Sequence, residues 1–186
     1  MRCQPSTRTL VTGLEPVMPS VALRPARQDD RKAIGRLMFD AYGEFEAFLT
    51  PGNWAQMMTN LARVVMDAGD EQLLVAEVHG RLAGTVTYYP PGPKDYNRVP
   101  PEWAVIRALA VHPACRRGGL ARMLTEECLR RARQDHASLV GLHTAELMVA
   151  ARAMYEGMGF RVQHTFTHLD ISFSVYALAL DAPPRA

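Results

Sequence analysis

Residues 109–121 read Leu109-Ala110-Val111-His112-Pro113-Ala114-Cys115-Arg116-Arg117-Gly118-Gly119-Leu120-Ala121. The stretch starts at the end of an apolar run, 103–111, which predicts a strand buried on both faces. It ends inside 119–135, the strongest helical pattern of the chain, whose apolar residues form one stripe. We therefore expect a strand that passes through a short Arg/Gly loop into the start of a long helix.

That loop has the chemistry of a phosphate site. The first turn of a helix offers backbone N–H groups that lack intrahelical partners, at the positive end of the helix dipole. Gly118 and Gly119 have no Cβ, so their backbone can approach a phosphate closely and adopt a positive φ. Arg116 and Arg117 can add charge-assisted hydrogen bonds. The spacing fits neither the G-x-x-x-x-G-K-[ST] nor the G-x-G-x-x-G nucleotide motif.

The remaining periodicities predict an α/β fold of the α+β type, with a mixed sheet and helices on both faces. The element order is β-α-α-β-β-β-α-β-α-β-β, and His79-Gly80 reads as a hairpin turn. The expected strands are 21–24, 72–78, 82–89, 103–111, 138–143, 160–166 and 174–180. The expected helices run from about 28 to 43, over 54–67, over 119–135 and over 150–157.

Length and terminal composition suggest one domain behind a leader. The 186 residues suit a single hydrophobic core. Residues 1–19 mix Pro, Ser, Thr and Gly without periodicity, so we interpret them as a flexible leader. They lack the apolar core of about 7–15 residues that a secretory signal needs, and no stretch approaches the ~18 apolar residues of a membrane span.

Cysteine content and charge narrow the class of protein further. The three cysteines are an odd number and one lies in the leader, which disfavours a disulfide framework and indicates a reducing cytoplasm. Their spacing fits no zinc site, and we expect no metal. The net formal charge of +2 argues against a nucleic-acid partner, despite the arginines that crowd residues 116–133.

These features resemble the GNAT superfamily of N-acetyltransferases. That family's pyrophosphate loop reads [RQ]-x-x-G-x-[GA], and Arg116, Gly119 and Ala121 stand at its three fixed positions. A second family block, N-x-x-A-x-x-[LM]-Y-x-x-x-G-F, matches residues 151–160 from the alanine onward. Its asparagine, which in the family usually contacts the pantetheine arm of the cofactor, is Met148 here.

The resemblance implies a sheet of about seven strands, mixed and mostly antiparallel, flanked by four helices in one domain over 20–182. It implies that acetyl-CoA inserts where the fourth strand splays from the fifth, and that a primary amine attacks the thioester directly. A backbone N–H of that strand would hold the developing oxyanion, and Tyr155 would protonate the departing thiolate. The implied cofactor-binding residues are Leu109, Ala110, Val111, Arg116, Arg117, Gly118, Gly119, Leu120, Ala121 and Arg152.

The general base and the acceptor pocket are harder to place. Many family members carry a Glu on the fourth strand at the position of Val105, and Glu102 is the nearest carboxylate that could act through water. His112, His164 and His168 are further candidates. By resemblance, the acceptor pocket involves Tyr42, Phe45, Phe48, Tyr88 and Tyr89, where Glu44 and Glu46 could attract a cationic amine.

Three readings of the whole pattern differ in class. The first is an enzyme that acetylates an amine on a small molecule or a peptide. The second is a GNAT-like module that binds acyl-CoA as a sensor and has little catalytic activity. Val105 and Met148, which replace a family glutamate and asparagine, favour this reading, whereas the presence of Tyr155 argues against it. The third, a nucleic-acid binder, is weak because the total charge is nearly neutral. The apolar run 175–180 also allows a homodimer through the last strands.

Overall fold

A computed structural model describes residues 21–69, 72–93 and 98–180. The expected leader, 1–19, lies outside the described residues. The strands are β1 (Val21–Pro25), β2 (Leu73–Val78), β3 (Arg81–Tyr89), β4 (Ala104–Val111), β5 (Leu139–Ala145), β6 (Arg161–His168) and β7 (Ile171–Ala179). The α-helices are α1 (Arg31–Tyr42), α2 (Pro51–Asp67), α3 (Leu120–Gln134) and α4 (Val149–Gly157), with short 3-10 turns η1 (Gln28–Asp30), η2 (Gly43–Phe48) and η3 (Pro113–Cys115).

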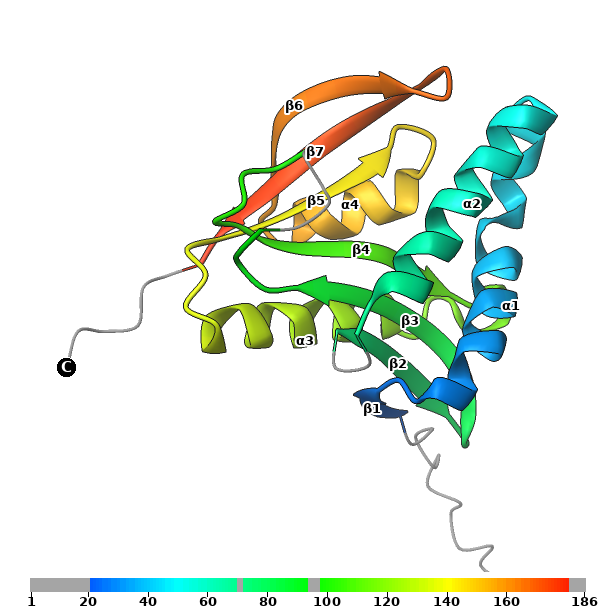
Figure 1. Ribbon diagram of the computed structural model, residues 1–186, viewed down its shortest axis with the longest axis horizontal. Coiled ribbons are helices and arrows are strands. Elements are labelled where there is room, and N and C mark those ends of the chain that lie inside the picture. The colour runs from blue at the N-terminus through cyan, green and yellow to red at the C-terminus, as the bar shows by residue number, and fades with distance from the viewer. Residues whose placement is uncertain (1–20, 70–71, 94–97, 181–186) are drawn as a thin grey trace, which may run out of the picture.

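The strands form one twisted sheet in the order β1-β2-β3-β4-β5-β7-β6 (Figure 1). Every neighbouring pair is antiparallel except β4 and β5, which run parallel. The prediction of a mixed, mostly antiparallel sheet with helices on both faces is therefore confirmed.

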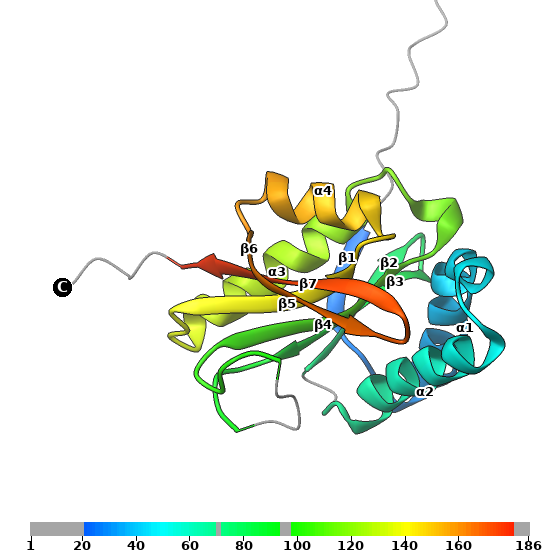
Figure 2. The same ribbon diagram turned by 90° about the horizontal axis from the view of Figure 1, so that it is seen from above.

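Two helical layers cover opposite faces of this sheet (Figure 2). Alternation along β2 shows why: Leu74 and Ala76 join the core beneath α3, whereas Leu73 and Val75 join the core beneath α1 and α2. The α3 stripe packs Leu120, Leu124 and other buried residues against the first face, as its helical spacing predicted.

Local chemistry explains where the observed elements differ from the expected ones. Helix α2 begins at Pro51, three residues earlier than predicted, because the Thr50 side chain accepts a hydrogen bond from the Asn53 N–H (3.2 Å) and proline suits the first helical position. Strands β6 and β7 meet in a tight turn at Leu169 and Asp170, with φ of 52° and 57°. The expected strands, 160–166 and 174–180, left a longer connection than the one observed, because β6 continues to His168 and β7 begins at Ile171.

Strand β4 is irregular where the functional site lies. The side chains of Val105 and Arg107 face the α2 side of the sheet. Ala108, at φ 52°, faces that side as well, although alternation would place it on the other, and Leu109 faces the α3 side. A register shift against β3 falls at the same place. This β-bulge reverses the facing of every later residue of the strand.

Candidate active site

An opening between β4 and β5 is the centre of the candidate site. The two strands pair only at Ala104 with Val140 and at Val105 with Gly141, and then diverge, as Figure 2 shows. Ala108 and Leu109 lie past this point and have no partner residue in β3 or β5 among the described strands. Their backbone groups therefore face an opening that an extended ligand could enter.

The Arg/Gly loop follows β4 directly. Arg117 and Gly119 have left-handed φ values of 65° and 79°, and Gly119 caps the 15-residue helix α3. Such left-handed positions turn successive N–H groups toward one side, which makes an anion-binding concavity. A Cβ at Gly119 would meet no atom within 4 Å, so neighbouring atoms do not require glycine there. The left-handed backbone conformation is what favours glycine at this position. Residues 116–119 are exposed to solvent, so a phosphate could reach them.

The arginines expected around the cofactor have different local contacts. Arg116 binds the Ala41 carbonyl (2.8 Å) and the Glu44 carboxylate (2.9 Å), which ties the loop to the end of α1. Arg117 is exposed. Arg152 donates from Nε to the Tyr176 hydroxyl (3.3 Å) on β7. The phosphate contacts of these three side chains remain predictions, and the observed contacts of Arg116 hold the loop against the end of α1.

Tyr155 reaches the opening from the α4 side. Its ring is 5% exposed and packs edge-on against Phe160, with centroids 5.5 Å apart. Burial, and then the nearby Tyr42 and Cys128, raise the pKa of Tyr155. Tyr42 lies across the sheet and donates from its hydroxyl to the Leu109 carbonyl (3.0 Å). The two phenols therefore approach the β4 bulge from opposite faces, and Tyr155 stays a protonated hydrogen-bond donor.

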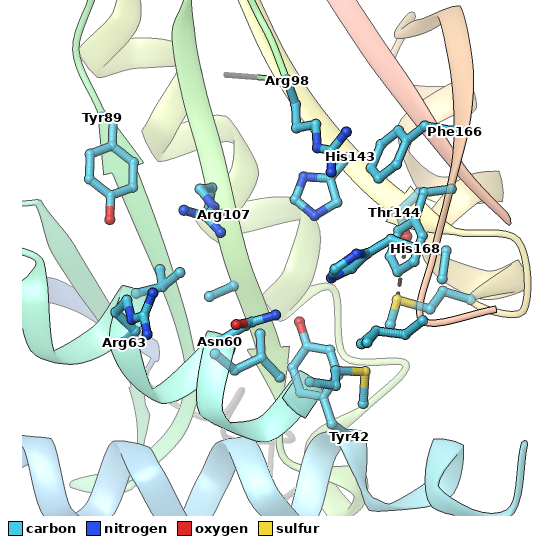
Figure 3. A pocket seen from close by; sticks show the side chains of 18 of the residues that line it. Tyr42, Asn60, Arg63, Tyr89, Arg98, Arg107, His143, Thr144, Phe166 and His168 are labelled. Atoms are coloured by element: carbon cyan, nitrogen blue, oxygen red, sulfur yellow. Dashed lines mark hydrogen bonds between the residues drawn. The ribbon is translucent and has the colours of Figure 1, made fainter. Parts of the chain in front are cut away.

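A cavity of about 680 Å³ occupies the α2 side of the opening. Its volume is in the range of small-molecule sites. Figure 3 shows Arg107 near its centre, with Arg98 and His143 to one side and Arg63 and Asn60 on α2 below. Strands β6 and β7 close one wall with Phe166, His168 and Phe173. Their turn is held to the start of α2, because Asn53 donates to the Leu169 carbonyl (3.1 Å) and to Asp170 (3.0 Å).

His143 is the buried titratable group of this cavity. Burial, followed by the charges of Arg107 and Arg98 and by His168, lowers the pKa of His143 to about 3. The imidazole is therefore neutral in the folded protein at physiological pH. Its ring packs at a tilt against both Phe166 and Phe173, with centroid distances of 6.0 and 5.7 Å.

This pKa predicts an acid-dependent loss of stability. An unfolded chain binds a proton at His143 near pH 6.5, whereas the folded chain does so only near pH 3, so stability falls as the pH drops through that window. We expect His143→Gln to flatten the decrease in melting temperature between pH 7 and 5. The matched change at an exposed position, His164→Gln, is the control. Equal decreases in both variants would contradict the assignment.

The structure does not bring every predicted residue to the site. Glu102 is exposed in the turn before β4 and does not line the cavity. It lies seven residues from Leu109, roughly 23 Å along an extended strand, so it is not retained as a base. Val105 is fully buried at the position of the family's glutamate.

Only some residues of the expected acceptor pocket line the cavity. Tyr42 and Tyr89 line the cavity. Tyr88 belongs to the opposite core and donates to Asp135 (2.6 Å), and Phe48 is 68% exposed. Glu44, expected to attract a cationic amine, is instead paired with Arg116.

Sequence reasoning missed the polar residues that define the cavity. Arg107 and His143 stand inside otherwise apolar strands, and this is the signal that could have found them: a charged or polar side chain in a buried strand needs a partner or a ligand. Arg98 and Arg63 come from a loop and from α2, and nothing local in the sequence marks them.

The residues present fit acetyl-CoA. The opening beyond Val105 can take an extended arm, and the turn at Arg117 and Gly119 can take a diphosphate at the start of α3. Met148 lines the opening at the family's asparagine position and accepts a hydrogen bond from the Thr144 hydroxyl (3.4 Å), so its sulfur fills the place of a polar contact.

Together, a sheet that opens between two parallel strands, an anion-binding helix start and an adjoining cavity define an acetyltransferase fold. The model of the acetyltransferase (GNAT) family matches residues 29–160. The chain therefore belongs to the GNAT acetyltransferase family. No curated protein matches it in sequence.

Solved structures agree on the fold. An N-acetyltransferase from Staphylococcus aureus Mu50 superposes with a TM-score of 0.65 at 18% identity, over 84% of this chain and 100% of that one. The ribosomal-protein-S18-alanine N-acetyltransferase from Escherichia coli has a TM-score of 0.63 at 18% identity, over 90% and 99% of the chains. A putative acetyltransferase from Salmonella typhimurium, solved with its cofactor acetyl-CoA, has a TM-score of 0.61 at 18% identity, over 90% and 99%.

Two searches of the described residues were negative. No helix in the described part of the chain combines the length and apolar character needed to cross a bilayer. Residues 21–69, 72–93 and 98–180 contain no group of three or more His, Cys, Asp or Glu side chains placed to hold a metal ion.

Proposed function

We propose that the chain transfers the acetyl group of acetyl-CoA to a primary amine by direct attack of that amine. The observation that carries the proposal is the β4 bulge, with the cavity on one face of the sheet and, on the other face, the core that contains Tyr155 and against which Leu109 packs. The Salmonella structure that binds acetyl-CoA shares this fold, which supports the same cofactor here. We further propose that the protein acts in the cytoplasm.

Each part of the opening has a role in this reaction. Acetyl-CoA supplies a thioester, whose carbonyl oxygen gains negative charge as the amine attacks. A backbone N–H of the β4 bulge is placed to stabilise that charge, a contribution of about 3–4 kcal/mol for one well-aligned donor. Tyr155 donates its proton toward the departing sulfur, and the raised pKa keeps that proton in place until then.

The amine must lose a proton before it attacks. An alkylammonium with a pKa near ~10.4 is neutral in only about one molecule in 2,500 at pH 7. Besides His143, whose lowered pKa makes it a poor proton acceptor, the cavity contains two side chains that can accept a proton, directly or through water: Asp67 and His168. We propose that the base is in this group, and that the cavity is where the acceptor binds.

Thermal stability and thiol release test the proposal together. Acetyl-CoA at ~100 times its Kd should stabilise the protein by about 2.7 kcal/mol, and an amine panel should release free thiol. Gly119→Ala should reduce that stabilisation, because alanine costs about 1–2 kcal/mol in the left-handed conformation that the loop requires. Gly52→Ala, at an unstrained and uncrowded position, is the matched control.

The outcomes separate the enzyme from the sensor. Stabilisation without thiol release from any amine would favour an acyl-CoA-binding sensor and contradict transfer. No stabilisation by acetyl-CoA would contradict both. Stabilisation by oligonucleotides alone would point to nucleic-acid binding.

A further inference from the structure

We propose that the acceptor carries an oxyanion, a carboxylate or a phosphonate, besides its amine, and that Arg98 and Arg107 bind this oxyanion in the cavity. The proposal rests on the proposed acetyl transfer and names its substrate class: a small amino acid or a similar amino acid analogue.

The charge of the lining residues carries the argument. Three arginines line the cavity, Arg63, Arg98 and Arg107, against one carboxylate, Asp67. Arginine is charged at every physiological pH. A molecule with only a cationic amine would enter a space of its own charge, and such like-charge contact is unfavourable. An acceptor with an anionic group offsets that repulsion.

The geometry places the cations on the route to the bulge. Arg107 immediately precedes Ala108 on β4, so its side chain leaves the strand beside the expected thioester. Figure 3 shows Arg98 approaching the same space from the loop before β4. An amine that reaches the bulge therefore has both guanidinium groups within reach of the rest of its molecule.

Arg98 is arranged to present its hydrogen-bond donors. Its guanidinium carbon lies 4.2 Å from the centroid of the Phe166 ring. Stacking on an aromatic ring uses the face of the guanidinium and leaves the N–H groups at its edge, which match a carboxylate or phosphonate in a two-point contact. Phe166 itself stacks on Phe173 (5.4 Å, 11° between planes), so the platform is fixed.

The electrostatics of neighbouring groups agree with this placement. After burial, the charges of Arg107 and Arg98 lower the pKa of His143. Burial raises the pKa of Tyr42 and of Tyr89, and the charge of Arg107 opposes that rise at both. One positive field therefore extends across the cavity from β3 to β5 and to the end of α1. With a volume of about 680 Å³, the cavity suits a small molecule.

A matched acceptor panel tests the proposal. Full-length protein with acetyl-CoA would be given α-amino acids, the same compounds as carboxamides, the amines that lack the carboxyl group, and aminoalkylphosphonates. Binding of each compound in the presence of CoA is measured by calorimetry beside thiol release. We expect kcat/KM and affinity to be at least about tenfold higher for the best acid than for its amide. This is the difference that hydrogen bonds to a charged group typically make. The carboxylate and phosphonate arms show which oxyanion the site prefers.

Variants test which residues hold the anion. Arg98→Gln should raise KM for the acid about tenfold and leave the amide within about twofold, and Arg98→Lys should restore part of the loss. Arg107→Lys should weaken the acid selectively, because lysine keeps the charge but loses the two-point contact. Arg36→Gln, an exposed arginine on α1 outside the cavity, is the control.

Each outcome decides a separate point. Amides or plain amines that match the acids, or an Arg98→Gln variant that weakens acid and amide equally, would overturn the oxyanion site and leave acetyl transfer standing. Acids that bind selectively without thiol release would support the oxyanion site and contradict acetyl transfer. Neither binding nor release with any compound would overturn both.

Discussion

Tyr155→Phe is expected to lower kcat for acetyl transfer by about 10²- to 10⁴-fold, the range that a positioned general acid contributes. The change removes one hydroxyl from a ring that is 5% exposed and keeps its edge-on contact with Phe160. Acetyl-CoA should therefore stabilise the variant as it does the parent protein. Single-turnover thiol release and thermal shift measure the two properties separately.

The pH profile adds a second readout for Tyr155. Because burial raises its pKa above the ordinary value near ~10, the phenol remains protonated through neutral and mildly alkaline pH. The parent protein should then show no alkaline loss of kcat from this group below about pH 10.

A matched tyrosine distinguishes chemistry from packing. Tyr88→Phe also removes a hydroxyl from a buried ring of the same core, here one that donates to Asp135 at the end of α3. It should change stability by about 1 kcal/mol and leave kcat nearly unaltered. If Tyr155→Phe retained kcat within about threefold while folded, the departing thiolate would need another proton source.

The sequence predicts the cofactor side of this site better than the acceptor side, and the reason is physical. Diphosphate binding depends on a strand end, a glycine turn and a helix start, which follow one another in residues 109–121 and leave a local pattern. The alternation of β2 and the stripe of α3 likewise specify which faces are buried, so element order and sheet class could be predicted.

The acceptor cavity leaves no comparable pattern, because its walls come from segments far apart in the chain. Arg63 lies on α2, Arg107 on β4 and His143 on β5, and only the fold brings them together around the cavity. Nothing in the residue types around Ala108 requires a left-handed φ, so the bulge could not be predicted from local propensity. Glu102, expected as a base, is exposed and does not line the cavity, since nearness in sequence is not nearness in the fold.

Phe160→Ala is expected to destabilise the protein by about 3–5 kcal/mol, the usual cost of removing a buried aromatic ring. Phe160 is fully buried in the core formed by α3, α4 and the sheet. Since small domains have total stabilities of about 5–15 kcal/mol, the loss is a large fraction of the whole. Urea unfolding at 25 °C measures it. Phe48→Ala, at a ring 68% exposed, should change stability by no more than about 0.5 kcal/mol.

Substitutions at Phe160 also test whether the second family block, residues 151–160, positions Tyr155 for its proposed role as proton donor. The cavity left by the Phe160 ring adjoins Tyr155, whose ring would lose the edge contact that fixes its orientation. Phe160→Leu keeps most of the volume and should remain folded, with a loss nearer ~1 kcal/mol. If Phe160→Leu lowers kcat more than its stability loss explains while acetyl-CoA still binds, the Gly-Phe end of the block acts by holding Tyr155 in place. If kcat is unchanged, Phe160 contributes stability alone, and the ring of Tyr155 is positioned by α4.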